Sequence, residues 1–229
     1  MSAIVRSIRL LSGSAALSVL AISAAGAQSC LGLAMPGRHY VGIESQRSYV
    51  SHARSTPVYG ARYAHRWDAG DVGLTLGLAG SAGAMRSDST AVNASVSLAA
   101  SRRLPEVSDA VSVCAAFGAE GRGVDVSSDD RLTDADGDGY FSTPLTLGLG
   151  YDLHVGALTV TPFVAPSVAR YWFESRAVEN GARQRGWDAF VTTGASATLD
   201  RFTVSASYRR GDASLDGAGR FAFSTGVAF

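Results

Sequence analysis

The chain has 229 residues, with 20 basic and 20 acidic residues and a formal net charge of zero. Charged residues make up only 17% of it, against roughly 25% in an average soluble domain. The balanced charge excludes a general nucleic-acid-binding protein, which would carry a basic excess. Beyond the N-terminus, no apolar run approaches the ~20 residues of a membrane-spanning helix, so a helical membrane protein is also excluded.

Residues 1–27 are predicted to form a secretory signal peptide. Arg6 and Arg9 supply its basic start, and residues 10–24 supply an apolar stretch shorter than a usual membrane span. Residues 25–27, Ala-Gly-Ala, place small side chains at the expected cleavage site. The alternative is an N-terminal helix that anchors the chain.

The remaining chain is predicted to divide into a lead-in at residues 28–38 and one domain at residues 39–229. In that domain, apolar residues alternate with small or polar ones at a period of two. This period is typical of β-strands, because successive side chains point to opposite faces. The predicted strands cover residues 40–46, 58–67, 72–81, 90–101, 110–120, 144–153, 158–168, 187–199, 202–210 and 220–229.

The connections between these strands alternate in length. Short polar links such as residues 68–71 and 154–157 alternate with longer ones such as residues 83–89 and 121–139. This alternation predicts a meander in which each strand pairs with the next. An even number of strands, about ten, places both termini at the end with the short turns. The alternative is eight strands, with the first two weak segments merged into the lead-in.

The two faces of the predicted strands differ in composition. One face carries Val, Leu, Phe and Tyr, and the other carries Gly, Ala, Ser and Thr with occasional charges. A soluble surface would carry far more charge, and a sheet inside a bilayer has to close so that every backbone group is paired. We therefore predict an all-β protein, a transmembrane antiparallel up-and-down meander β-barrel, with apolar side chains toward lipid and small polar ones toward the lumen.

Aromatic residues gather near the ends of the predicted strands, where they would form interfacial girdles. The alternative is an ordinary aromatic core. The residues concerned are Tyr59, Tyr63, Trp67, Tyr151, Tyr171, Trp172, Trp187, Phe202, Tyr208, Phe221 and Phe229.

The chain ends on an aromatic residue inside a strand. Phe221, Phe223, Thr225, Val227 and Phe229 alternate on one face. Together with the signal peptide and the meander, this strand resembles the C-terminal insertion signal of the small bacterial outer-membrane β-barrel superfamily, such as the OmpA-like and OmpX-like membrane barrels. The resemblance implies the bacterial outer membrane as location, its lipid as surroundings, and an insertion machine that recognises the last strand. It implies no single activity.

A set of charged residues falls on the face that carries the small residues. It comprises Glu44, Arg62, Arg66, Glu120, Arg122, Asp152, Asp188, Arg209 and Arg220. Glu44 and Arg220 lie on the strands that would pair to close the barrel, and Asp188 and Arg209 lie on adjacent strands. The set is either a charged constriction that lines a pore or a group of mutually neutralised packing charges. The second interpretation is favoured, because an unpaired buried charge is costly.

The two cysteines of the chain, Cys30 and Cys114, are predicted to form a disulfide. An exported protein reaches an oxidising compartment, and both residues fall at the short-turn end, so a bridge would pin the lead-in at the barrel mouth. The alternatives are two free thiols and lipidation of Cys30, for which Gln28 suits the cleavage region poorly.

An acidic loop is a weak calcium candidate. Asp134, Asp136 and Asp138 alternate before Gly139 and match the front half of a calcium-binding loop. The twelfth position is Leu145 rather than the bidentate Glu, so the complete motif is absent. The alternative is a solvated acidic loop with no cofactor.

The sequence favours an outer-membrane barrel with a structural or weakly porin-like role and surface-exposed loops. One alternative is a membrane-embedded lipid-modifying hydrolase or acyltransferase, and another is a secreted soluble barrel that binds an apolar ligand in an apolar lumen. The histidines His39, His52, His65 and His154 complete no recognisable catalytic constellation, so we expect no enzyme. We also expect no nucleic-acid partner, and the oligomeric state stays open.

Overall fold

The computed structural model describes residues 29–32, 35–50, 53–54, 57–86, 89–126, 138–175, 182–211 and 219–229. The predicted signal peptide lies outside these ranges, as do Asp134, Asp136 and His52. Within them, no helix is long and apolar enough to span a membrane.

Ten long strands, preceded by a short 3-10 turn, make up the described fold. Their alternating apolar and small residues suit a sheet with two different faces. Two further strands are very short, and one of them, β8, continues the line of β7 beyond Asp152. In chain order the elements are η1 (Ser29–Leu31), β1 (His39–Val50), β2 (Ala53–Arg54), β3 (Val58–Ala69), β4 (Val72–Arg86), β5 (Ser89–Leu104), β6 (Ser108–Val126), β7 (Asp138–Tyr151), β8 (Leu153–Val155), β9 (Leu158–Ser175), β10 (Ala182–Leu199), β11 (Phe202–Gly211) and β12 (Gly219–Ala228).

The long strands form one closed antiparallel barrel. Each pairs with the next in the chain, and β12 pairs with β1, for example Tyr40 with Ala228 and Glu44 with Ser224. The ring of pairings leaves no long strand with a free edge, which removes the aggregation risk of an open sheet. The predicted fold class, an antiparallel meander barrel of about ten strands, is confirmed.

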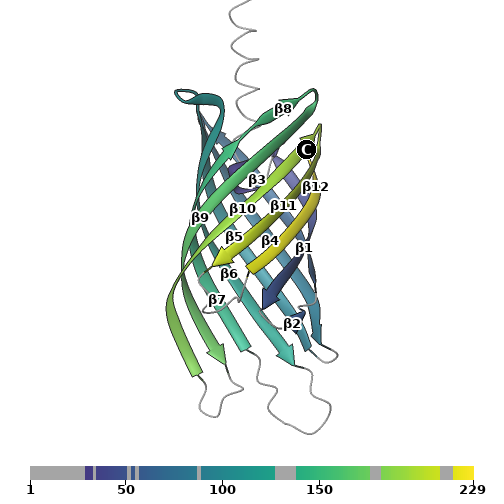
Figure 1. Ribbon diagram of the computed structural model, residues 1–229, viewed down its shortest axis with the longest axis vertical. Coiled ribbons are helices and arrows are strands. Elements are labelled where there is room, and N and C mark those ends of the chain that lie inside the picture. The colour runs from purple at the N-terminus through teal and green to yellow at the C-terminus, as the bar shows by residue number, and fades with distance from the viewer. Residues whose placement is uncertain are drawn as a thin grey trace, which may run out of the picture.

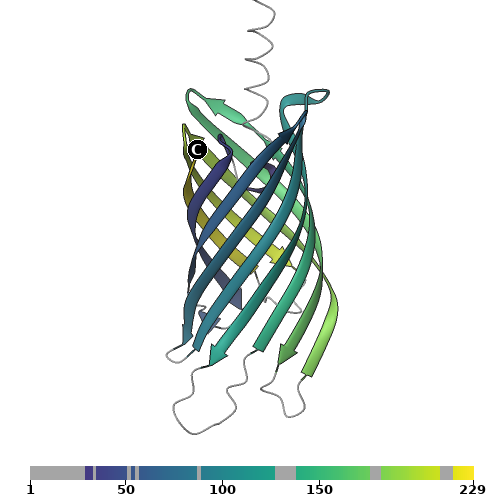
Figure 2. The same cartoon turned by 180° about the vertical axis from the view of Figure 1, so that it is seen from behind.

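The two ends of the barrel differ (Figure 1). At one end, tight turns join β3 to β4, β5 to β6, β8 to β9 and β10 to β11, and the C-terminus lies there too (Figure 2). Gly70 and Gly156 occupy two of these turns at φ values of 64° and 61°, which glycine adopts without the steric cost of a side chain. We call this the turn end and the opposite one the loop end.

Several strands reach further toward the loop end than the alternation predicts. β6 continues to Val126, β9 continues to Ser175, and β4 and β5 extend until only residues 87–88 separate them. The expected long loop at residues 83–89 is therefore wrong. Polar and charged side chains obscure the period of two in these extensions, but the backbone still finds partners on both neighbouring strands.

The barrel exterior is apolar and its interior is polar, as predicted. Leu147 and Leu149 are 61% and 49% exposed, whereas Thr161 and Ser196 are 1% exposed. The exposed apolar residues include Val41, Ile43, Leu78, Val92, Val96, Leu98, Phe117, Leu145, Val164, Val168, Val191 and Val204. Tyr171 is an exception to the predicted aromatic girdle, because it shares the inward side of β9 with Phe163 and Ala169.

Candidate functional site in the barrel lumen

Small hydroxyl side chains line the lumen and leave room inside it. Because Ser and Thr are short, the interior holds space that larger side chains and a folded-in segment can occupy. The buried hydroxyl residues are Thr75, Ser81, Ser101, Ser112, Ser142, Thr161, Ser167, Ser196, Thr203 and Ser224.

The N-terminal segment of the described chain occupies the lumen near the turn end. The turn η1 contacts β6, β7 and β9 from the inside, and Cys30 forms a disulfide with Cys114 of β6 across a Cα–Cα distance of 6.1 Å. Cys30 is completely buried. The disulfide thus fixes this segment, which we call the plug segment (residues 29–32), to the barrel wall.

Glycines on the wall make room for the plug segment. A side chain at Gly150 would bring its Cβ within 2.9 Å of Cα of Cys30, and one at Gly148 would overlap the carbonyl oxygen of Cys30. Phe163 pairs with Gly150 from the neighbouring strand β9. It faces inward and is 7% exposed, and a Cβ at Gly32 would lie 2.7 Å from its ring. The small residues of β7 therefore allow close contact between the wall and the plug segment.

A second group of residues closes the turn end beside the plug segment. Met35, Tyr40, Ala64 and Ala228 form a buried apolar cluster. Polar contacts lie at the same end of the barrel. Asp152, between β7 and β8, pairs with Arg103 of β5 at 3.2 Å and accepts a hydrogen bond from the hydroxyl of Thr161 of β9 at 2.6 Å. Asp152 and Thr161 are both buried, and the contacts between them and with Arg103 offset their desolvation cost.

Arg66 holds a further ion pair at the turn end. Its guanidinium lies 2.9 Å from the carboxylate of Asp68, two residues further along β3. The Arg66 side chain is 5% exposed and that of Asp68 is 41% exposed, so the pair runs from the interior to the rim. Water at the rim screens this pair and lowers its contribution to stability.

An ion-pair network crosses the lumen nearer the loop end. Glu120 of β6 lies 3.0 Å from Arg220 of β12 and 3.6 Å from Arg209 of β11. Five strand pairings separate β6 from β12 in either direction around the barrel, so Glu120 and Arg220 project from opposite walls. Arg209 also lies with its guanidinium 4.3 Å from the ring centre of Phe190. We call Glu120, Arg209 and Arg220 the transverse triad.

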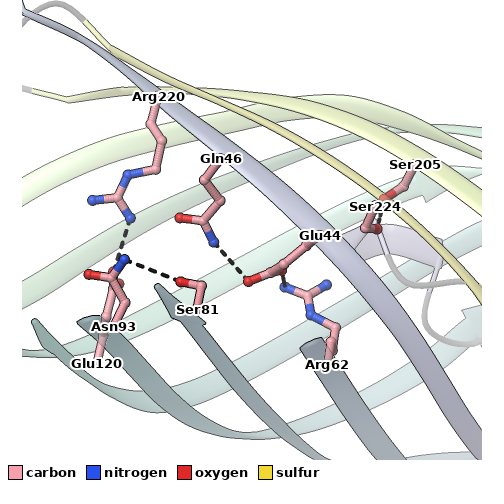
Figure 3. A network of polar contacts seen from close by, with 9 residues as sticks. All are labelled: Glu44, Gln46, Arg62, Ser81, Asn93, Glu120, Ser205, Arg220 and Ser224. Carbon is pink, nitrogen blue, oxygen red and sulfur yellow. Dashed lines mark hydrogen bonds and ion pairs between the residues drawn. The ribbon is translucent and has the colours of Figure 1, made fainter. Parts of the chain in front are cut away.

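A second ion pair lies beside the triad (Figure 3). Glu44 of β1 lies 3.4 Å from Arg62 of β3 and accepts a hydrogen bond from Gln46 at 3.0 Å. The Glu44 side chain is 4% exposed, so its charge is compensated by neighbours rather than by bulk water. In the same region, Asn93 donates a hydrogen bond to Ser81 at 3.2 Å.

The space between the plug segment and the triad is a cavity of about 280 Å³. Leu31, Gly32 and Phe163 line it from the turn end, and the residues of both ion-pair groups line it from the loop end. Its further lining includes Ser95, Ser97, Thr146, Ser167, Thr192, Ser205, Ser207 and Ser224. Apolar side chains, among them Leu31, Phe163, Ala165 and Phe190, contribute the rest of the lining. The mixed lining can hold water and small polar solutes.

The structure places most of the predicted lumen charges inside the barrel, but some of their partners differ from those that strand adjacency suggests. Glu44 contacts Arg62, and Arg220 contacts Glu120, so the expected proximity of Glu44 and Arg220 across the closing seam gives no ion pair between them. Asp188 is half-buried on the inward side of β10. The side chains of Arg122 and Asp138 lie outside the described part of the structure.

Sequence reasoning missed several residues of the lumen. Arg103 pairs with Asp152, and the Phe163 ring lies against Gly32. The Phe190 ring lies under the guanidinium of Arg209, and Leu31 lines the cavity. None of these four is among the site residues predicted from the sequence. The parity of β5 and β10 already assigns Arg103 and Phe190 to the inward face. The position of Leu31 had no such signal, because the lead-in has no strand period.

Two of the histidines lie on the outside at the turn end. Nδ1 of His39 lies 3.2 Å from Nδ1 of His65 and 3.0 Å from the hydroxyl of Tyr63. The His39 ring stacks on Phe229 with 5.5 Å between ring centres. The cluster thus contains the first residue of β1 and the residue that follows β12, which meet at the turn end of the seam between these strands.

Comparison with known proteins leaves the family open. No protein-family model matches the chain, and no curated protein matches it. Among solved structures, the chain is similar to the translocator domain of the autotransporter NalP from Neisseria meningitidis, with 13% identity, 98% of each chain covered and a TM-score of 0.46. It is also similar to the N-terminal β-barrel domain of Pseudomonas aeruginosa OprF, with 13% identity, coverage of 84% of this chain and 99% of that one, and a TM-score of 0.37. A third similar structure is Ail, the attachment invasion locus protein of Yersinia pestis, with 10% identity, coverage of 82% and 93%, and a TM-score of 0.35.

Proposed function

We propose that this chain is a bacterial outer-membrane barrel that spans the bilayer with its ten strands and exposes its loop end at the cell surface. The apolar exterior supports this proposal. On β7 the outward residues run from Phe141 to Tyr151, ten steps that cover about 26 Å across a membrane at ~3.4 Å per residue and a ~40° tilt. That span matches the ~25 Å apolar band of outer-membrane barrels.

The lumen supports a structural role with low conductance at rest. The observation that carries this conclusion is the plug segment, which the Cys30–Cys114 disulfide holds inside the barrel at the turn end. The transverse triad adds a second obstruction nearer the loop end. A barrel obstructed at two levels offers no wide aqueous path, so its outer surface and its loop end are the parts available to other molecules.

A weakly porin-like role is the second candidate. The cavity of about 280 Å³ and its lining of hydroxyl and arginine side chains favour it, because a polar lumen accommodates water and small ions. In this case a solute passes only when the plug segment or the triad moves.

Conductance of the purified barrel in planar lipid bilayers tests the structural proposal. We expect low conductance from the wild-type chain under oxidising conditions and a clear increase after reduction of the disulfide. The Cys30→Ser/Cys114→Ser variant should show the higher conductance without reductant and should not respond to it. A large, steady wild-type conductance that reduction leaves unchanged would contradict the structural role and favour the porin-like one.

The remaining alternatives receive less support. A soluble barrel that carries an apolar ligand needs an apolar lumen and a polar exterior, whereas this barrel has charged and hydroxyl residues in its lumen and Val, Leu and Phe on its exterior. A lipid-modifying enzyme needs a catalytic constellation. Of the described histidines, His39 contacts Tyr63 and His65 on the outside, and His154 is exposed in β8. Recognition of the C-terminal strand by an insertion machine and weak calcium binding at Asp134, Asp136 and Asp138 remain predictions.

A further inference from the structure

Two arginines and two tryptophans form two neighbouring cross-strand Arg–Trp pairs on the outside of the β9–β10 hairpin. Arg170 lies directly opposite Trp187, and Trp172 lies directly opposite Arg185. All four side chains are exposed, Trp172 by 36% and Trp187 by 69%. The arginines therefore occupy one diagonal, about 7–8 Å apart between strands, and the tryptophans occupy the other. We call these four residues the Arg–Trp patch.

The patch lies where the apolar exterior ends toward the loop end. On β9 the outward series passes Val164 and Val168 before it reaches Arg170. On the neighbouring β7, Leu145 pairs with Val168 and Phe141 pairs with Trp172. From the patch to the turn end, the outward positions of β7 and β9 carry no charged residue. The patch is thus the first charged row that a lipid meets on leaving the apolar band.

Arg170 and Trp172 of the patch contact each other. The guanidinium carbon of Arg170 lies 5.2 Å from the ring centre of Trp172, within the range of a cation–π contact. The rings of Phe141 and Trp172 have centres 5.4 Å apart. Strand parity places Arg170 on the outer surface, and there its guanidinium lies beside the Trp172 ring.

The charge of the patch has no compensating carboxylate among the described side chains. The ion pairs of the described structure include neither Arg170 nor Arg185. By contrast Arg102, an exposed arginine at the turn end, lies 3.3 Å from the carboxylate of Glu106. An arginine that faces lipid is costly in hydrocarbon and stable at the polar interface, where lipid phosphate is an available anion.

We propose that the Arg–Trp patch is a binding site for the phosphate of an anionic membrane lipid at the loop-end interface. The guanidinium groups of Arg170 and Arg185 approach one phosphate from two sides, each with a donor fork that matches its oxygens. Trp172 and Trp187 lie at the level of the head groups, where indole rings are favoured, and pack against the first methylenes of the acyl chains. This inference rests on the proposed membrane-spanning role.

The chain provides its own fluorescent reporter for this site. It contains three tryptophans, of which Trp172 and Trp187 belong to the patch and Trp67 lies at the turn end. In a Trp67→Phe background, all tryptophan emission therefore comes from the patch. Lipids that carry bromine on their acyl chains quench an indole ring only on contact, so they report which lipid occupies the site.

The test compares two brominated lipids in vesicles that contain the full chain. The probes are brominated phosphatidic acid and brominated phosphatidylcholine, each diluted into unbrominated phosphatidylcholine. We expect roughly 30-fold preferential binding of phosphatidic acid, reported by quenching, given the attraction of two basic residues for an anionic surface. The Arg170→Gln/Arg185→Gln variant should reduce this preference nearly to one, and the Arg102→Gln control should leave it unchanged.

Further measurements separate the sources of failure. The Arg170→Lys/Arg185→Lys variant retains both charges but lacks the bidentate forks, so we expect a preference between those of the wild type and the Gln variant, even if the Gln variant fails to fold. Excess inorganic phosphate at constant ionic strength should not displace the lipid, and displacement would overturn the lipid as the ligand.

Quenching by brominated phosphatidylcholine separates this inference from the proposed function. If phosphatidylcholine quenches the patch but phosphatidic acid shows no preference, or if the Gln variant keeps the preference, the lipid-phosphate site is wrong and the membrane-spanning role stands. If brominated phosphatidylcholine quenches neither the patch nor Trp67 in the wild-type chain, the membrane-spanning role itself is wrong.

Discussion

Arg209 and Arg220 lie directly opposite each other on β11 and β12, and both reach the same carboxylate on the far wall of the barrel. Like charges directly opposite one another destabilise a sheet. Glu120 offsets that repulsion, and in doing so it links the C-terminal strands to β6 through the lumen. The triad therefore stabilises the barrel by linking opposite walls, and it also obstructs the lumen.

Removal of the Glu120 carboxylate should destabilise the barrel. Glu120→Gln leaves two facing arginines with no counter-charge, so we expect a loss of about 2–3 kcal/mol in the free energy of unfolding, less than for a fully buried pair because the side chains are 12–30% exposed. Urea unfolding in phospholipid vesicles, followed by tryptophan fluorescence, measures it. Glu120→Gln/Arg220→Gln should recover part of the loss.

The matched control for this prediction is Glu106→Gln. Glu106 pairs with Arg102 on the surface, where both side chains are about half exposed or more, so we expect a change within about 0.5 kcal/mol. Equal effects of Glu106→Gln and Glu120→Gln would show that the triad contributes no more than a surface ion pair.

The cost of a charge on the exterior should depend on its depth in the bilayer. Leu147 lies in the middle of the outward series of β7, and Tyr151 lies at its turn-end limit. We expect Leu147→Arg to lower the free energy of unfolding by about 2–4 kcal/mol and Tyr151→Arg by about 0–1 kcal/mol. The same vesicle-based unfolding assay measures both. Equal costs at the two positions would contradict a bilayer centred on this band.

The plug segment should depend on the glycines beneath it. Gly150→Val places a branched side chain against Cys30, whose Cα lies 2.9 Å from the position of the new Cβ, so we expect the variant to impair closure of the disulfide. Alkylation of free thiols followed by mass spectrometry measures the unpaired fraction. Gly80→Val is the control, because the nearest atom to its Cβ is 4.0 Å away. Complete disulfide formation in Gly150→Val would contradict close packing of the plug segment.

Strand parity predicts much of this fold and part of the lumen. The alternation assigned Glu120, Arg209 and Arg220 to the inward face, because a period of two needs only local sequence. It did not predict that Glu120 meets Arg220, because contacts across the lumen depend on strand number and on the stagger at closure. The contact of the plug segment with β7 escaped prediction for a similar reason, since glycine alternation shows that space exists but not what fills it.

The C-terminal residue should matter both for the seam and for assembly. Phe229 exchanges two backbone hydrogen bonds of 2.9 Å with His39, and their rings stack. We expect Phe229→Ala and His39→Ala each to cost about 1 kcal/mol of unfolding free energy through the lost ring contact, and His39→Ala to lose in addition the contacts of His39 with Tyr63 and His65. If Phe229 is also read as an insertion signal, Phe229→Ala should lower the yield of folded barrel in cells far more than His39→Ala, although His39→Ala is at least as destabilising in vesicles. The folded fraction is measured by the change in electrophoretic mobility on heating. Equal yields of the two variants would restrict Phe229 to its structural role at the seam.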